Sequence, residues 1–177
     1  MTRHDDAPKR ASHDDRDADL AYVGRSVLVS RPISEVYQFW RDPTRFPLFM
    51  KAVDAVEKTV EGYVWTVRAP AGQSVTLITK VTEDSPDSVI AWESVPASQI
   101  KTRGRVTFTP APAGRGTVLT ADIAYDPPAG DLGRLVAKLF GAEPNIQARH
   151  ELKRFKMLLE AGEIATGSFH RQQQNEE

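Results

Sequence analysis

Short stretches of alternating apolar and polar residues fill the middle of the chain, and helical spacing appears on either side of them. Residues 22–30 form an apolar run rich in β-branched side chains, which predicts a first strand. The next segment, 32–41, begins with proline, a residue suited to the first turn of a helix. Within it Val36, Phe39 and Trp40 fall at positions i, i+3 and i+4, so we predict a short helix with one buried face.

Prolines at positions 43 and 47 end this helix, and a series of extended segments separated by turn residues follows. We predict strands over 51–59, 63–70, 73–83, 88–95, 99–109 and 117–126. Glycine, proline, serine or aspartate stands at the breaks between them, as turns require. Because the connections are short, we expect neighbouring strands to pair in antiparallel fashion.

Alternation in two of these segments separates a covered face from a solvated one. In 63–69 one face carries Tyr63, Trp65, Val67 and Ala69, and the other carries Val64, Thr66 and Arg68. In 100–109 one face carries Ile100, Thr102, Gly104, Val106 and Phe108, and the other carries Lys101, Arg103, Arg105, Thr107 and Thr109. The basic row on the second face is typical of a solvated strand surface, and the apolar faces require a cover.

The C-terminal third of the chain supplies that cover. Helical spacing is kept by Leu132, Leu135, Val136, Leu139 and Phe140, and again by Ala148, Leu152, Phe155, Leu158 and Leu159. Pro144 removes a helical hydrogen bond between the two sets, which favours a short helix followed by a long one. The predicted fold class is therefore α+β, with an antiparallel sheet around a long terminal helix and either a filled core or a ligand cavity between them.

Both ends of the chain differ in composition from this patterned part. Residues 1–20 carry six aspartates and four Lys or Arg with almost no large apolar side chain, which predicts a disordered tail. Residues 167–177 are also polar and without pattern, so we expect a second disordered tail. The expected folded domain runs from 21 to 166.

Charge and cysteine content narrow the possible partners. With 23 Lys and Arg against 24 Asp and Glu the net charge is −1, so we expect no nucleic-acid partner. The absence of cysteine excludes disulfides and cysteine nucleophiles. With no apolar leader and no apolar run of about 20 residues, we expect a cytoplasmic protein without an integral membrane segment. The pattern leaves the oligomeric state open.

Residues that carry catalytic or metal chemistry are sparse. Three of the four histidines, His4, His13 and His170, fall in the predicted tails, and His150 lies among charged residues of the terminal helix. The sequence has no pair of histidines at metal-ligand spacing and no serine in a Gly-x-Ser-x-Gly turn. We therefore expect no metal, no cofactor and no covalent catalysis.

Five strings resemble a known superfamily over nearly the whole of residues 21–167. They are RPISEVYQFWRDPTRFPLFM (31–50), IAWESV (90–95), GRGTVLTADIAYDPPAG (114–130), LGRLVAKLFGAEP (132–144) and FKMLLEAGEIATG (155–167). The chain resembles the START-like, Bet v 1-like superfamily, in the branch of polyketide cyclase/dehydrase-like and coenzyme Q-binding proteins. This resemblance implies a helix-grip fold, a seven-stranded antiparallel sheet wrapped around the C-terminal helix, with hydrophobic molecules bound between them.

Candidate cavity-lining residues follow from the inward faces of these elements. They are Trp65, Val67, Leu77, Trp92, Phe108, Ile123, Tyr125, Leu139 and Phe155. The expected function is binding of a lipid, quinone, isoprenoid or aromatic polyketide. One alternative is a cyclase or dehydratase in which Glu93 or Tyr125 moves a proton; another is an accessory, chaperone-like protein that binds no ligand.

Overall fold

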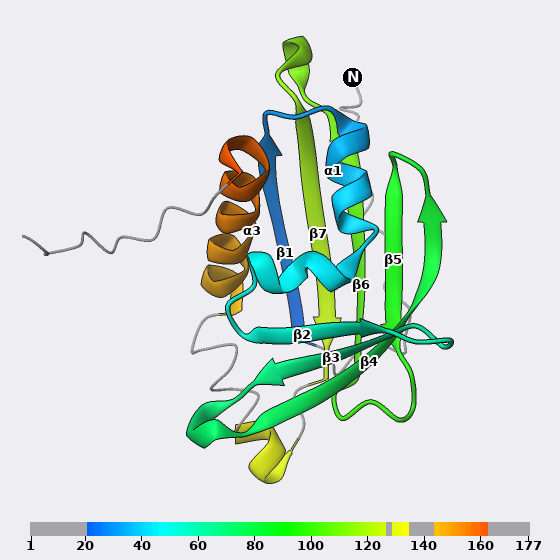
Figure 1. The fold of residues 1–177 in the computed structure, drawn as a ribbon, viewed down its shortest axis with the longest axis vertical. Helices are drawn as coiled ribbons and strands as arrows, with labels where there is room; N and C mark the ends of the chain where they lie inside the picture. Colours follow the sequence, from blue (N-terminus) through cyan, green and yellow to red (C-terminus); the bar gives the residue numbers. More distant parts are fainter. Residues whose placement is uncertain (1–20, 127–128, 135–143, 163–177) are drawn as a thin grey trace, which may run out of the picture.

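The computed structural model describes residues 21–126, 129–134 and 144–162 (Figure 1). The predicted tails, 1–20 and 167–177, and the predicted domain end at 166 lie outside the described residues. The candidate Leu139 also lies outside them.

The strands and helices follow the predicted order, with bounds that shift by up to three residues. In chain order they are β1 (Ala21–Val29), α1 (Ile33–Trp40), η2 (Pro43–Leu48), β2 (Val53–Lys58), β3 (Tyr63–Arg68), η3 (Pro70–Gly72), β4 (Ser74–Ser85), β5 (Val89–Ser94), β6 (Thr102–Pro110), η4 (Pro112–Gly114), β7 (Thr117–Tyr125) and α3 (Pro144–Ala161). Residues 130–134 are also helical.

All seven strands belong to one antiparallel sheet with the order β1-β7-β6-β5-β4-β3-β2. The sheet is strongly twisted, so that β2, β3 and the first part of β4 run across the direction of β1, β7 and β6 (Figure 1). β4 bends between these two directions, and a bulge interrupts its pairing with β5 between Val81 and Glu83. The predicted α+β, helix-grip fold is confirmed.

Register assigns each strand residue to one face of the sheet, because directly paired residues point to the same side. The chain of partners Val27–Leu119–Phe108 and Val23–Ile123–Gly104–Trp92 runs across four strands. This face, which we call the inner face, is covered by α1, η2 and α3 (Figure 1). The predicted apolar face of 100–109 is thereby confirmed as the inner one.

Helix α3 lies alongside β1 and bonds to the backbone of this edge strand (Figure 1). Lys156 Nζ donates to the Leu28 carbonyl at 2.7 Å, and the Ser30 amide donates to Glu160 Oε1 at 2.7 Å. Polar contacts of this kind satisfy edge groups that would otherwise be open to pairing with another chain.

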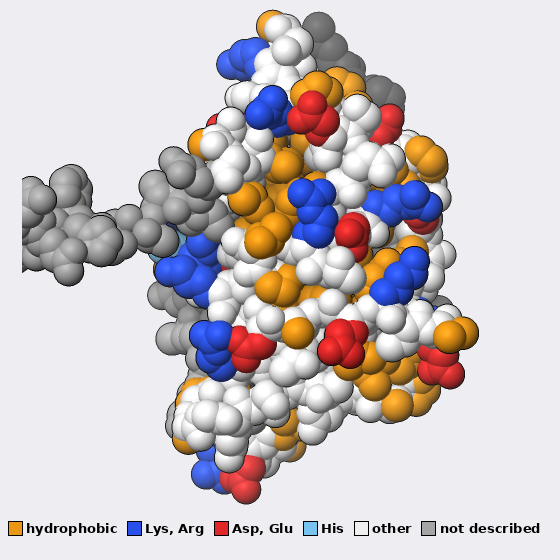
Figure 2. Space-filling view, viewed as in Figure 1, with side chains coloured by type: hydrophobic (Ala, Val, Ile, Leu, Met, Phe, Trp, Pro, Cys, Tyr) orange, Lys and Arg blue, Asp and Glu red, His pale blue; other side chains and the backbone are white. Residues whose placement is uncertain are grey.

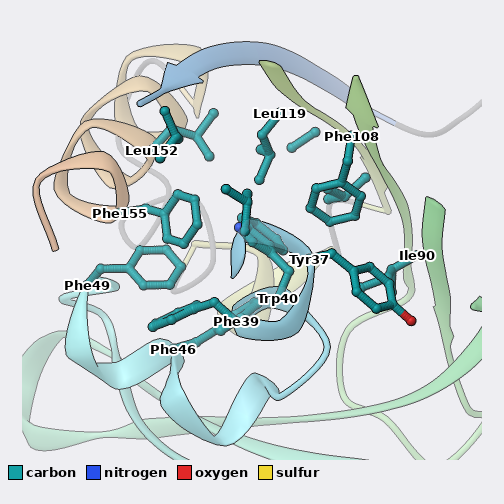
Figure 3. Close-up of a cluster of buried hydrophobic side chains, with 14 residues drawn as sticks. Tyr37, Phe39, Trp40, Phe46, Phe49, Ile90, Phe108, Leu119, Leu152 and Phe155 are labelled. Carbon is teal, nitrogen blue, oxygen red and sulfur yellow. The ribbon is translucent and has the colours of Figure 1, made fainter. Parts of the chain in front are cut away.

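The largest buried cluster gathers aromatic side chains from α1, η2 and α3 over one half of the inner face (Figure 3). We call it the packed cluster; its buried members are Val29, Val36, Tyr37, Phe39, Trp40, Phe46, Phe49, Ile90, Val106, Phe108, Leu119, Ala121, Leu152 and Phe155. Phe155 is fully buried, and its ring lies 5.3 Å from that of Phe39 and 5.2 Å from that of Phe49.

The 3₁₀ helix η2 was not predicted, because its two prolines resemble a simple chain break. Asp42 caps it by accepting a hydrogen bond from the Thr44 amide at 3.2 Å, and Pro43 occupies its first turn. The turn carries Phe46 into the packed cluster, with Phe49 directly after it.

A second, smaller buried cluster lies at the other side of the inner face. Its buried members are Ala69, Val75 and Ile100, and Leu77 and Leu132 pack against it. Leu132 belongs to the helical residues 130–134, which therefore contact the β3–β4 end of the sheet.

Candidate ligand-binding face

Six of the predicted lining residues remain only half-buried, although they lie on the covered side of the sheet. We call them the half-buried band; they are Trp65, Val67, Leu77, Trp92, Ile123 and Tyr125. Trp65 and Trp92 pack against the packed cluster, and Leu77 packs against the smaller one. The half-buried band therefore lies next to both clusters, but its side chains are not fully buried as those of the clusters are.

Trp65 is held in place by a neighbouring strand. Its Nε1 donates a hydrogen bond to Thr79 Oγ1 at 2.9 Å, and Thr79 itself is buried. The indole also meets the ring of Phe46 edge-on, with centroids 5.5 Å apart. Because its polar group is already satisfied, Trp65 offers an apolar, fixed surface.

Trp92 lies against the backbone of the adjacent strand. Its direct partner on β6 is Gly104, and a Cβ built there would lie 2.1 Å from Cζ2 of the indole. The indole ring therefore lies on Gly104, and the Trp92 side chain is still partly exposed to solvent.

Polar groups next to the band are bonded within the protein. The Thr102 amide donates to Ser94 Oγ at 3.0 Å, and Thr102 Oγ1 donates to the Ala124 carbonyl at 3.0 Å. Tyr125 lies at the end of β7, opposite Thr102 and Ala21. The inner face is thus mainly apolar, with hydroxyl groups at the ends of β5, β6 and β7.

The structure brings seven of the nine predicted lining residues onto the inner face of the sheet, but in two different environments. Phe108 is only 3% exposed and lies in the packed cluster, edge-on to Tyr37 with ring centroids 5.8 Å apart. The other six form the half-buried band. Phe155 reaches the packed cluster from α3, and Leu139 lies outside the described residues.

The two residues considered for proton transfer are placed on opposite faces. Glu93 is exposed on the outer face, where Lys80 Nζ lies 3.0 Å from its Oε1. Tyr125 is half-buried on the inner face. His150 is exposed on α3.

A polar contact joins α1 to the bulged part of β4 at the margin of the packed cluster. The buried Tyr37 hydroxyl donates to Asp84 Oδ1, and Arg41 Nε donates to Asp84 Oδ2 at 3.0 Å. The hydrogen bond from Tyr37 holds the pKa of Asp84 below its usual value. Burial and the bond to Asp84 raise the pKa of Tyr37.

A second polar contact ties α3 to the end of η2. Arg154 Nε donates to the Phe49 carbonyl at 2.8 Å, and its guanidinium pairs with Glu151. Gln147 Nε2 also donates to Glu151 Oε1 at 2.8 Å. Burial raises the pKa of Glu151 despite the opposing effect of Arg154. These contacts had no signal in the sequence beyond the helical spacing of the three residues.

The described residues offer neither a metal site nor a helix that could span a membrane. No three of their His, Asp or Glu side chains are grouped so that they could hold a metal ion. None of the helices in the ranges the structure describes is long and apolar enough to cross a membrane. On the side of the molecule that carries α1 and η2, positive and negative side chains are interspersed (Figure 2).

Comparison with known families identifies the class of protein. Residues 29–153 match the family described as polyketide cyclase / dehydrase and lipid transport, and the chain belongs to this family. A curated relative, a 17.2 kDa protein from the melC2–rnhH intergenic region of Streptomyces lincolnensis, is 28% identical over 89 residues, 50% of this chain. The matched stretch spans 59% of that relative's length.

Solved structures show the same fold. A protein from Deinococcus radiodurans is 33% identical, with a TM-score of 0.63 over 80% of this chain and 99% of its own. The Zhui aromatase/cyclase of Streptomyces sp. R1128 is 17% identical, with a TM-score of 0.60 over 82% and 99% of the two chains. A START superfamily protein from Mycobacterium smegmatis is 16% identical, with a TM-score of 0.56 over 78% and 98%. The predicted START-like, Bet v 1-like fold is confirmed, and the family match confirms the predicted polyketide cyclase/dehydrase branch.

Proposed function

We propose that this protein binds a hydrophobic small molecule, a lipid, quinone, isoprenoid or aromatic polyketide, over the half-buried band of the inner face. The observation that carries the proposal is the contrast in burial along one sheet face. Residues of the packed cluster are closed off from solvent, whereas the band next to them keeps accessible apolar surface. Apolar surface that stays accessible inside a curled sheet is what a binding site for apolar molecules requires.

The energetics allow useful affinity without any covalent or ionic contact. Burying about ten methylene groups contributes about 8 kcal/mol at about 0.8 kcal/mol each. Association and ordering cost several kcal/mol, which leaves an affinity weaker than micromolar, since a micromolar dissociation constant alone corresponds to about 8 kcal/mol. The hydroxyl groups of Ser94 and Tyr125 lie at the end of the band, where they orient a polar head group.

Native mass spectrometry of the purified protein tests the proposal directly. A co-purified apolar molecule gives a mass above that of the chain, and release by mild activation gives the mass of the ligand. For a protein that purifies empty, titration with a short-chain ubiquinone analogue should quench tryptophan emission in a saturable way, with a midpoint above about one micromolar.

Two adjacent residues of β4 provide a matched pair of variants. Leu77 belongs to the half-buried band on the inner face, and Ile78 points to the outer face of the sheet; both are half-buried. Leu77→Asn should weaken quinone binding by about tenfold because it places an amide in the binding surface, whereas Ile78→Asn should leave binding within about twofold. Equal loss in both variants, or a flat titration of the wild-type protein, contradicts the proposed site.

A further inference from the structure

Gly104 lies directly beneath the indole of Trp92. A Cβ at this position would come within 2.1, 2.5 and 2.6 Å of Cζ2, Cε2 and Cη2 of the ring. Carbon atoms in favourable contact are about 3.5–4.0 Å apart, so even one methyl group at Gly104 is incompatible with this position of Trp92.

The glycine is not required by its own backbone. Gly104 is not among the described glycines whose φ is positive. It pairs in regular register with Trp92 on β5 and with Ile123 on β7. A glycine in the interior of a strand loses side-chain packing and marks a close approach of another group. Here the group that approaches is the indole of Trp92.

The large indole of Trp92 therefore lies close to the surface of the sheet. Lying over Gly104, Trp92 covers the backbone of β6 instead of projecting from the sheet toward the helices. How far the indole rises above β5 and β6 therefore depends on the absence of a side chain at position 104. Ile123, the partner of Gly104 on β7, lies on the same face and is also half-buried.

We infer that Gly104 is a specificity-determining residue that acts through Trp92, keeping the inner face deep enough for ligands with wide, fused rings. This inference rests on the proposed function. With alanine at 104 the indole is pushed off the sheet toward the helices, and the space narrows. Wide ring systems are then excluded, whereas a single slim alkyl chain still fits beside the displaced ring.

The test compares two probes of different width, 1-pyrenecarboxylate and decanoate, by isothermal titration of the wild type and four variants. Gly104→Ala should weaken pyrenecarboxylate relative to decanoate by about tenfold, the effect of a modest steric misfit in an apolar pocket. Gly24→Ala is the matched control, because Gly24 is a strand glycine on the outer face, next to the side chains of Asp122 and Tyr22. It should change the ratio of the two affinities by less than about twofold.

The remaining two proteins, Trp92→Leu and Trp92→Leu/Gly104→Ala, show whether Gly104 acts through the indole. Without the indole, alanine at 104 should leave the ratio of affinities within about twofold. If Gly104→Ala alone does not fold, the double variant should fold and bind as Trp92→Leu does. An unchanged ratio in Gly104→Ala, or an equally large change in both backgrounds, overturns the inference. Wild-type protein that binds neither probe overturns the proposed function, and the inference with it.

Discussion

The inner face of the sheet is divided into a packed half and the half-buried band, although the same strands supply both. On β7, Leu119 and Ala121 are buried, and the next inward residues, Ile123 and Tyr125, are half-buried. The difference comes from what covers them: aromatic rings of α1, η2 and α3 close over the first half (Figure 3). One half therefore stabilises the fold, and the other is the proposed binding surface.

The comparison predicts its largest effect on stability in the packed half. Phe155→Ala removes a fully buried ring with aromatic neighbours on three sides, and should lower the free energy of unfolding by about 3–5 kcal/mol. Leu77→Ala in the half-buried band should cost about 1 kcal/mol, because much less surface is buried there. Urea unfolding of both variants measures the difference. Equal losses would mean that the two regions are equally packed.

Removing the hydrogen bond that fixes Trp65 should lower the free energy of unfolding by an intermediate amount. Thr79→Val keeps the side-chain shape but removes the acceptor of the indole N–H, which should cost about 1–2 kcal/mol and alter tryptophan emission. Thr66→Val on the outer face of β3 provides the control and should leave the emission spectrum unchanged. An unchanged spectrum in Thr79→Val would show that Trp65 is held by packing alone.

The contact between Tyr37 and Asp84 at the margin of the packed cluster predicts a pH dependence. Since the pKa of Asp84 is lower in the folded protein than its ordinary value of 3.8, its stabilisation is present above about pH 4 and is lost as the pH falls through the folded-state pKa. Asp84→Asn should be less stable by about 1 kcal/mol at pH 7, a modest figure because the carboxylate is partly exposed.

Urea unfolding between pH 2 and 7 measures this dependence. The difference between wild type and Asp84→Asn should vanish at the acid end. A difference that is constant with pH would mean that the charge of Asp84 contributes nothing.

Replacing Glu151 on α3 should give the smallest change in stability. The pH dependence that Glu151 contributes should have the opposite sign to that of Asp84. Burial raises its pKa above the ordinary 4.5 in the folded state, so the wild type should gain stability as the pH falls through the raised value toward 4.5. Glu151→Gln should lack this gain and differ from wild type by less than about 1 kcal/mol at pH 7, because the desolvation of the charge and its pairing with Arg154 oppose each other. Thermal unfolding at several pH values between 4.5 and 8 compares the two proteins. A wild type that loses stability on acidification over this range contradicts the prediction.

Period-2 patterns and turn residues were enough to predict the strands and their inner faces, because side chains alternate wherever the backbone is regular. They could not predict the bulge of β4, where strict alternation after Thr79 and Val81 would place Glu83 inside. The extra residue turns Glu83 outward to Arg105, 2.6 Å away, and turns Asp84 toward Tyr37. A bulge adds one residue without a characteristic sequence.

The sequence predicted which face of the sheet carries the candidate site, but not how deeply each residue on that face is buried. Phe108 and Trp92 carry the same signal, an aromatic residue on an apolar strand face, yet Phe108 is buried and Trp92 is half-buried. The difference depends on η2 and on which helix lies above each strand, and neither is encoded locally. Gly104 was assigned to the inner face from its alternation, but only the three-dimensional contact shows that Trp92 lies on it.

The three tryptophans of the chain allow one direct measurement of the central claim, since Trp40 belongs to the packed cluster and Trp65 and Trp92 to the half-buried band. In protein labelled with 5-fluorotryptophan, each gives its own ¹⁹F resonance, assigned by single Trp→Phe variants. On addition of a short-chain ubiquinone analogue, the resonances of Trp65 and Trp92 should shift in proportion to occupancy, and that of Trp40 should stay in place. Resonances that do not shift at all, or a Trp40 shift as large as the other two, would contradict the division of the inner face into a packed half and a binding half.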